Sequence, residues 1–224
     1  MSGSCLVMVA HPDDEVLGAG GTIARLARSG STVNIAFLAD GVGARAGDQS
    51  AVKRRIEAAR KAASLMGARA PQFLGFPDNR LDQLELLDIT QAIEKVIVEV
   101  KPDTVYTHHA GDLNIDHAVC HRAVLTACRP LPGATVRRIY AMEVASSTEW
   151  AGPSAHSAFL PSRFVDIAAV QAIKRAALEA YAEEMRPFPH PRSLDAVDAL
   201  AKWRGATAGL TSAEAFMVVR EIEP

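Results

Sequence analysis

The sequence predicts an α/β fold with a mainly parallel sheet. Short apolar runs alternate with segments of helical spacing: CLVMVA at residues 5–10 and TVNIAFLAD at 32–40 are typical of buried strands, and EVLGAGGTIARLARSG lies between them. Polar residues gather where the predicted strands end, which is where ligands bind in open α/β sheets. Strands that alternate with helices favour right-handed βαβ units, and thus a Rossmann-like three-layer fold.

The individual elements follow from their boundaries. The helix after the first strand ends at Gly30, and glycine is well suited to a helix end. Pro102 stops a helix at 86–100, because proline does not continue a helix. The remaining elements are expected as helices at 50–67, 116–128, about 168–185 and about 193–205, and as strands at 103–109, 136–144 and near AFMVVR.

The chain shows no internal repeat, low-complexity tract or linker, so residues 1–224 are expected to form one domain. The regular alternation covers residues 1–145, which we expect to be the Rossmann-like core. Residues 146–224 are less regular and are expected to be a C-terminal elaboration of that core.

Composition excludes several classes of function. A formal net charge of −2 and a pI near 6.4 give no general attraction to nucleic acid or anionic membrane. No apolar run approaches the ~18 residues of a membrane span, and the N-terminus lacks the basic region of a signal peptide. Cys5, Cys120 and Cys128 form no CxxC pair, so we expect buried thiols in a reducing, cytoplasmic location. A homo-oligomer is left open.

Residues 10–15, AHPDDE, follow the first predicted strand and pose a choice between helix capping and ligand binding. An acidic residue in the first turn stabilises a helix by ~0.3–1 kcal/mol, because its charge lies at the positive end of the helix dipole. Asp13 or Asp14 could therefore cap the helix that follows. Capping explains neither His11 nor the need for two adjacent aspartates.

A nucleotide-binding Rossmann module is a second interpretation. Gly18, Gly20 and Gly21 follow the first strand, and Asp40 ends the second, where a ribose-binding acid would lie. The third fingerprint position is isoleucine, however, and a pyrophosphate would face the acids of PDDE. A further glycine motif, GVGARA at 41–46, has no acid at the end of a following strand. This interpretation is therefore the weaker one.

A metal site accounts for more of these residues at once. His11 and Asp14 are three positions apart on one loop, and His117 begins a helix at the end of another strand, so we expect all three at one edge of the sheet. Two imidazoles and a carboxylate are the ligand set of a catalytic zinc site, which keeps one position open. Asp13, beside the metal but not bound to it, could then take a proton from a water whose pKa zinc lowers to ~7.

The motif AHPDDEVLGAGGTIARL, together with GDLNIDHAVCHRAV, resembles the LmbE-like, or PIG-L, family of zinc-dependent deacetylases. The stretches RRIEAARKAASLMG, LGFPDNRL, EMRPFPHPRS and AEAF extend the resemblance over most of the chain. It implies a hydrolase that removes an N-acetyl group from an amino sugar or its conjugate, with residues 146–224 completing the substrate pocket. It also implies His11, Asp14 and His117 as metal ligands and Asp13 as general base. Zn²⁺ is the expected metal, although these ligands would accept Fe²⁺, Mn²⁺ or Co²⁺.

The resemblance further implies residues that contact the substrate. Arg54, in RRIE, matches a substrate-binding arginine of the family, and a solvated helix face explains its position equally well. Asp78, in FPDN, matches an acid that binds sugar hydroxyls, and a turn beside Pro77 explains it nearly as well. Asp116 is expected in a supporting position, where it orients a neighbouring side chain.

One position departs from the family pattern. Many members have HxDH in the second motif, and its first histidine polarises the substrate carbonyl; here that position is Asn114. Asparagine can donate a hydrogen bond to an oxyanion but cannot protonate the leaving amine. Either Asp13 carries both proton transfers or another histidine substitutes. The candidates are His108, His109 and His190, and Arg192 beside the last could bind an anionic group.

The expected reaction is hydrolysis of a linear amide C–N bond. The metal would polarise the acetyl carbonyl, Asp13 would deprotonate the attacking water, and Asn114 or a nearby histidine would help to stabilise the oxyanion. The partner is a small-molecule N-acetylated sugar, not nucleic acid. Two alternatives stay open: an amidase acting on a thiol conjugate with the same metal site, and a non-catalytic module that holds a ligand such as a nucleotide.

Overall fold

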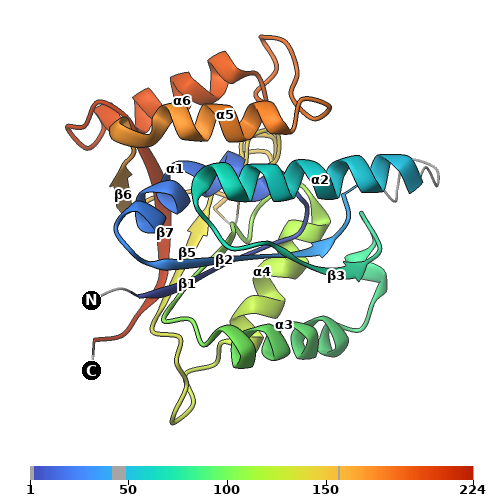
Figure 1. The fold of residues 1–224 in the computed structure, drawn as a ribbon. Helices are drawn as coiled ribbons and strands as arrows, with labels where there is room; N and C mark the ends of the chain where they lie inside the picture. Colours follow the sequence, from blue (N-terminus) through green and yellow to red (C-terminus); the bar gives the residue numbers. More distant parts are fainter. Residues whose placement is uncertain (1–2, 42–48, 156, 224) are drawn as a thin grey trace.

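A seven-stranded sheet in the order β3-β2-β1-β4-β5-β7-β6 runs through the centre of the computed structural model, which describes residues 3–41, 49–155 and 157–223 (Figure 1). The strands lie parallel except β7, which is antiparallel to both of its neighbours. This arrangement confirms the predicted α/β fold with a mainly parallel sheet. The strands are β1 (Ser4–Val9), β2 (Thr32–Ala39), β3 (Gln72–Phe76), β4 (Thr104–His108), β5 (Arg138–Met142), β6 (Arg163–Asp166) and β7 (Ala213–Glu221).

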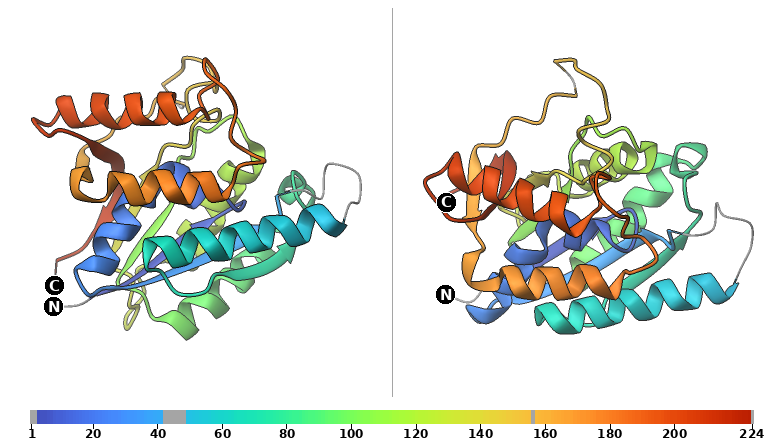
Figure 2. Two further views of the ribbon diagram at one scale, coloured as in Figure 1. Left: turned by 45° about the horizontal axis from the view of Figure 1, so that its top comes forward. Right: turned by 90° about the horizontal axis from the view of Figure 1, so that it is seen from above.

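Helices cover both faces of the sheet (Figures 1 and 2). On one face α1 (Asp14–Arg28), α2 (Gln49–Met66) and α5 (Gln171–Ala180) pack against one another, and α6 (Leu194–Ala206) packs along β7. On the other face lie α3 (Leu86–Val100) and α4 (Ile115–Ala127), with the short 3₁₀ helix η1 (Leu81–Gln83) beside α4. A second 3₁₀ helix, η2 (Ala168–Val170), precedes α5. None of the helices described here is long and apolar enough to cross a membrane.

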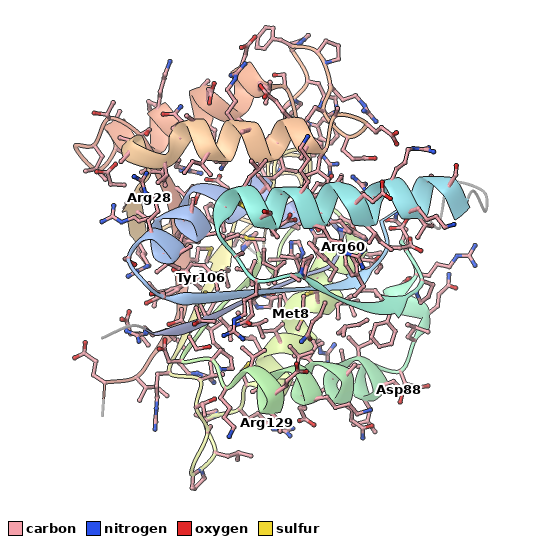
Figure 3. All side chains as sticks on the ribbon, in the orientation of Figure 1. Met8, Arg28, Arg60, Asp88, Tyr106 and Arg129 are labelled. Carbon is pink, nitrogen blue, oxygen red and sulfur yellow. The ribbon has the colours of Figure 1, made fainter. Side chains whose placement is uncertain are left out.

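The central strands are buried on both faces, which explains why their sequences are continuously apolar. Met8 points into the core beneath α3 and α4, whereas Tyr106 of β4 belongs to the core on the other face. Figure 3 shows both side chains inside the molecule, with the charged groups of Arg60, Asp88 and Arg129 on its outside.

Helix α1 is fixed to the sheet by a buried ion pair. Glu214 of β7 accepts the backbone N–H groups of Gly21 and Thr22, at 2.8 and 2.7 Å, and the Nζ of Lys174 at 2.7 Å. The same Nζ donates to the carbonyl of Leu17 at 3.0 Å. In a regular helix the N–H of Gly21 and the carbonyl of Leu17 lie one turn apart and face each other, so Glu214 and Lys174 add hydrogen bonds at one turn of α1.

Two expectations differ from the structure. The helix predicted over 168–185 is wrong at both ends: its first residues form η2, and α5 ends at Ala180. The chain leaves the helix there because Tyr181 and Glu184 turn inward to contact buried charged groups. Strands β3 and β6 were not predicted, since both are short, half-buried edge strands without a continuous apolar run.

Candidate metal centre

The polar residues identified from the sequence meet at the carboxyl ends of β1 and β4. His11 and Asp14 follow β1, and Asp14 is the first residue of α1. His117 lies in the first turn of α4, on the chain that leaves β4. The two segments are a hundred residues apart in the sequence, and the parallel pairing of β1 with β4 brings them together.

Three donor atoms of these residues lie close enough to share one cation. One donor atom from each of His11, Asp14 and His117 lies within 4.8 Å of the other two. Asp14 Oδ1 is 3.4 Å from His117 Nε2, and both atoms are buried without a hydrogen-bond partner in the described part of the chain. Unpaired buried polar atoms are costly unless a ligand satisfies them, and this pair fits a divalent metal ion.

A carboxylate supports each histidine from behind. Asp112 Oδ2 lies 2.8 Å from Nδ1 of His117, and Asp116 Oδ2 lies 3.0 Å from Nε2 of His11. An imidazole that donates its proton to such a carboxylate keeps a lone pair on the opposite nitrogen. The lone pairs are then Nε2 of His117 and Nδ1 of His11, and the latter lies 3.4 Å from Asp14. Sequence reasoning missed Asp112, which the motif GDLNIDH contains five positions before His117.

The electrostatics of the centre favour a cation. Burial lowers the pKa of His11, but the carboxylates of Asp116, Asp14 and Asp78 outweigh it and hold that pKa well above its usual range. Burial raises the pKa of Asp14, but the interactions with His117 and His11 outweigh it and hold the pKa of this carboxyl well below its usual range. Several buried carboxylates thus surround His11, and a bound metal ion would balance their charge.

Asp78 and Asp116 both lie at His11. Asp78 Oδ1 is 3.2 Å from Nε2 of His11, and the side chain is buried, as for a supporting carboxylate. Asp116 also accepts the backbone N–H groups of Asn79 and Leu81, at 2.7 and 3.0 Å. Its position is that of a residue that orients His11, whereas binding of sugar hydroxyls by Asp78 stays a prediction.

Asp13 occupies the N-cap position of α1 but does not cap the helix with its side chain. Its φ of 120° lies in a region that non-glycine residues rarely adopt, and its carboxylate forms no capping hydrogen bond. Instead Oδ2 lies 3.0 Å from Arg192 Nη1 and 3.5 Å from Arg55 Nη1. Burial raises the pKa of Asp13 above its usual value, although the two guanidinium groups lower it. A carboxylate of raised pKa is a stronger base than a free one, which suits a residue that accepts a proton.

The structure places Arg54 and its neighbour in different surroundings. Arg54 has a half-exposed side chain, and its Nε lies 2.8 Å from Glu183. Arg55 is buried and contacts Asp13 and the carbonyl of Gly41. Successive residues of α2 point about 100° apart, and Arg55 is the one that turns toward Asp13. A role for Arg54 in binding substrate stays a prediction.

The proposed substitutes for the missing histidine have other partners. Asn114 caps α4, because its Oδ1 accepts the N–H of Asp116 at 2.9 Å. The ring of His108 stacks on His117 with centroids 3.8 Å apart, and its Nε2 accepts a backbone N–H at 2.8 Å. Burial holds the pKa of His108 well below its usual range, so the ring is neutral. The stacked ring fixes the orientation of His117 without adding a charge to the centre.

His109 and His190 lie on the surrounding loops. Nε2 of His109 lies 3.2 Å from the carbonyl oxygen of Ser157, and the ring of His190 packs edge-on against Trp150. Within the described residues neither ring hydrogen-bonds to His11, Asp14 or His117. A role for either in binding substrate stays a prediction.

The glycines that suggested a dinucleotide site have a packing role instead. A Cβ at Gly18 would lie 2.6 Å from the sulfur of Met142, and one at Gly21 would lie 2.6 Å from Ile167. Both positions let α1 lie close to its neighbours and are inside the helix, not at its N-terminus. The second motif, at 41–46, lies outside the described residues after Gly41.

Comparisons with known proteins show which family and fold this chain is similar to. The sequence profile of the family described as PIG-L, GlcNAc-PI de-N-acetylase, matches residues 6–128. The "uncharacterized deacetylase YaiS" of Escherichia coli is 33% identical over 132 residues, which cover 57% of this chain and 69% of that protein. A "probable N-acetyl-alpha-D-glucosaminyl L-malate deacetylase 2" of Bacillus cereus is 31% identical over 152 residues, covering 64% and 69%. Among solved structures, the conserved protein TT1542 of Thermus thermophilus superposes with a TM-score of 0.79 at 25% identity, over 99% of this chain and 97% of that one.

Proposed function

This chain belongs to the PIG-L family, and on that premise we propose that it is a metal-dependent hydrolase that removes the N-acetyl group from an amino sugar or an amino-sugar conjugate. The relatives named as deacetylases support the reaction class, and the name of the B. cereus relative supports an N-acetylglucosaminyl substrate. Zinc is the metal that we propose, since a His₂Asp donor set with an open position is typical of catalytic zinc.

One observation carries the proposal: Asp14 Oδ1 and His117 Nε2 are buried, unpartnered in the described chain and 3.4 Å apart. Together with His11 they would hold the ion. A bound divalent ion would supply Lewis acidity toward the amide carbonyl and would lower the pKa of a nearby water to ~7. The carboxylates of Asp112 and Asp116 would keep both imidazoles oriented with their lone pairs toward it.

Asp13 is the proposed general base. Its carboxylate is adjacent in sequence to the ligand Asp14 and is not one of the three donors. It would accept a proton from the attacking water and later deliver a proton to the nitrogen of the departing amine. One carboxyl would carry both transfers, because the side chain at the alternative position, Asn114, has no proton to give to an amine.

The chain around Asp13 would keep bulk water out of the site, apart from the attacking water. Asp13 is 3% exposed, His11 is 7% exposed and Asp14 is fully buried, so the substrate's acetyl group would approach from the side on which His11 and Asp13 retain their small exposure. A buried, water-poor site strengthens the electrostatic interactions on which such a reaction depends.

The test combines metal content with amine release. Purified wild type and the variants Asp14→Ala and Asp13→Ala are analysed for bound metal and assayed on a panel of N-acetyl amino sugars and their conjugates. We expect about one metal ion per wild-type chain, loss of metal and activity in Asp14→Ala, and retained metal with most of the turnover lost in Asp13→Ala. Near-normal turnover in Asp13→Ala would show that another group is the base.

The panel also separates the alternatives. It includes an N-acetylated sugar that is joined to a thiol, which tests deacetylation. It also includes an amide of a thiol conjugate, which tests the amidase alternative with the same metal site. Asp88→Ala, an exposed carboxylate on α3, serves as the matched control and is expected to keep both metal and activity. A metal-free wild type that binds a nucleotide would contradict the proposal.

A further inference from the structure

The segment at residues 184–192, EMRPFPHPR, follows α5 and reaches the candidate metal centre from the far end of the chain. Figure 2 shows the chain between α5 and α6 as a long loop. Two of its residues, Glu184 and Arg192, are in contact with the surroundings of Asp13. The proposed reaction does not otherwise use this segment.

Four charged side chains form a nearly closed cluster, which we call the Asp13 clamp: Asp13, Arg55, Glu184 and Arg192. Arg192 Nη1 lies 3.0 Å from Asp13 Oδ2 and 3.9 Å from Glu184 Oε2. Arg55 lies 3.5 Å from the same oxygen of Asp13 and 3.1 Å from Glu184 Oε1. Each arginine thus bridges both acids, and the two positive charges balance the two negative ones.

The clamp is buried, so these contacts are not surface ion pairs of little consequence. The side chains of Asp13, Arg55 and Glu184 are 4, 6 and 5% exposed. Arg192 is 21% exposed, and its Nε is bound to Ser146 Oγ at 2.7 Å. Removing one partner of a buried, hydrogen-bonded charge cluster leaves the others without compensation.

The clamp holds the carboxylate of Asp13 away from the helix, because the backbone position of Asp13 would otherwise favour capping of α1 by this carboxylate. At an N-cap position an aspartate normally accepts an N–H of the first helical turn. Here the carbonyl oxygen of Asp13 accepts from Val16 and Leu17, while the carboxylate turns away from the helix. Its N–H donates to Glu15 Oε2 at 3.0 Å, and Tyr181 donates to the other oxygen of Glu15 at 2.6 Å. Hydrogen bonds at both the N–H and the carbonyl of Asp13 therefore maintain its unusual φ of 120°.

We propose that Arg192, Arg55 and Glu184 are positioning residues for Asp13. The two arginines hold Oδ2, which leaves Oδ1 to exchange the proton, and Glu184 keeps both guanidinium groups in place. This inference rests on the proposed function, since it assigns a purpose to the clamp only if Asp13 moves a proton. It replaces the expectation that Arg192 binds an anionic group of the substrate, because two of its nitrogens already have partners.

The test is a comparison of Arg192→Met with Arg186→Met in the metal-loaded full-length enzyme. Arg186 lies in the same segment and is exposed, and within the described residues its guanidinium group donates to the carbonyls of Glu183 and Met185. For Arg192→Met we expect kcat to fall about 100-fold, as misplacement of a reacting group by ~1 Å does, with KM within about twofold and metal content unchanged. Arg186→Met is expected to match wild type.

Conservative variants distinguish positioning from general stability. Arg192→Lys keeps a cation near Asp13 and is expected to recover part of the lost kcat, and Glu184→Gln is expected to lower kcat without changing KM. A raised KM with unchanged kcat in Arg192→Met would overturn the inference in favour of substrate binding. Loss of metal together with activity in this variant would overturn it in favour of a structural role.

A crystal structure of Arg192→Met keeps the inference separate from the proposed function. We expect the carboxylate of Asp13 to turn toward the N–H groups of the first turn of α1, where it would cap the helix. An unmoved Asp13 would refute the clamp. If wild type hydrolyses nothing on the panel, the proposed function fails, while the structure still shows whether the clamp sets the position of Asp13.

Discussion

The buried ion pair between Lys174 and Glu214 gives a sharp prediction for stability. Glu214→Gln keeps the shape of the side chain and removes its charge. Glu214 accepts three donors through two oxygens: the N–H groups of Gly21 and Thr22 and the Nζ of Lys174. A glutamine has only one acceptor oxygen, so its NH₂ group must face at least one of these donors.

The cost follows from two contributions. A buried N–H left unpaired costs about 1–3 kcal/mol, and breaking a buried ion pair by removal of one partner costs about 3–5 kcal/mol. The contributions overlap, because Lys174 keeps its bond to the carbonyl of Leu17. We therefore expect a loss of about 4 kcal/mol in the free energy of unfolding, which lowers the Tm of a chain of this size by roughly 8–16 °C.

Urea denaturation followed by circular dichroism measures this loss. The titration is run in the presence of a chelator, because a metal ion that binds only the native state adds its own stabilisation. Glu179→Gln is the matched control: its carboxylate is 56% exposed, pairs with Arg175 at 3.5 Å and should contribute less than about 0.5 kcal/mol. A loss below about 1 kcal/mol in Glu214→Gln would refute the reasoning, because it would mean that the backbone hydrogen bonds of α1 satisfy these N–H groups without the carboxylate.

Three further predictions concern the site and the thiols. Asp112→Ala should weaken zinc binding about 10- to 100-fold in a calorimetric titration, since Nδ1 of His117 loses its 2.8 Å partner; unchanged affinity would contradict that support. Burial raises the pKa of Cys128 to about 12, and also the pKa of Cys5 and Cys120, so the reactive thiolate is scarce at pH 8. A thiol reagent should then modify the protein only after denaturation, and rapid native labelling would show that a thiol is accessible. Arg54→Ala should change KM less than about twofold, because its ion pair with Glu183 is exposed; a larger rise would show that Arg54 binds substrate.

The fold and the meeting of His11, Asp14 and His117 at one edge of the sheet could be predicted because their signals are local. The apolar runs identify strands buried on both faces, and polar residues at the ends of parallel strands must meet at one edge of the sheet. His11 and Asp14 are close in sequence, and His117 begins the helix after a strand that pairs directly with β1. No distant side-chain packing was needed to bring these residues together.

The surroundings of the donors depend on contacts that the sequence does not encode locally. Arg54 and Arg55 are neighbours on an amphipathic helix, and only the packing of α2 against α1 and α5 decides which one turns inward. The partner of Arg55, Glu184, is 129 positions away in a stretch predicted to be helical. Its inward turn ends α5 at Ala180, so the error in the predicted helix and the missed clamp have the same cause.

The two edges of the sheet affect how copies of this protein can meet. At one edge β6 has only 4 residues, with Arg163 and Asp166 at its ends. At the other edge β3 has 5 residues, and Gly75, with a φ of 76°, lies where the register with β2 shifts. Short, charged or bulged edges are poor templates for an added strand. The fold therefore resists the edge-to-edge stacking that leads exposed sheets into aggregates, and its copies are expected to remain separate at high concentration unless helices or loops join them.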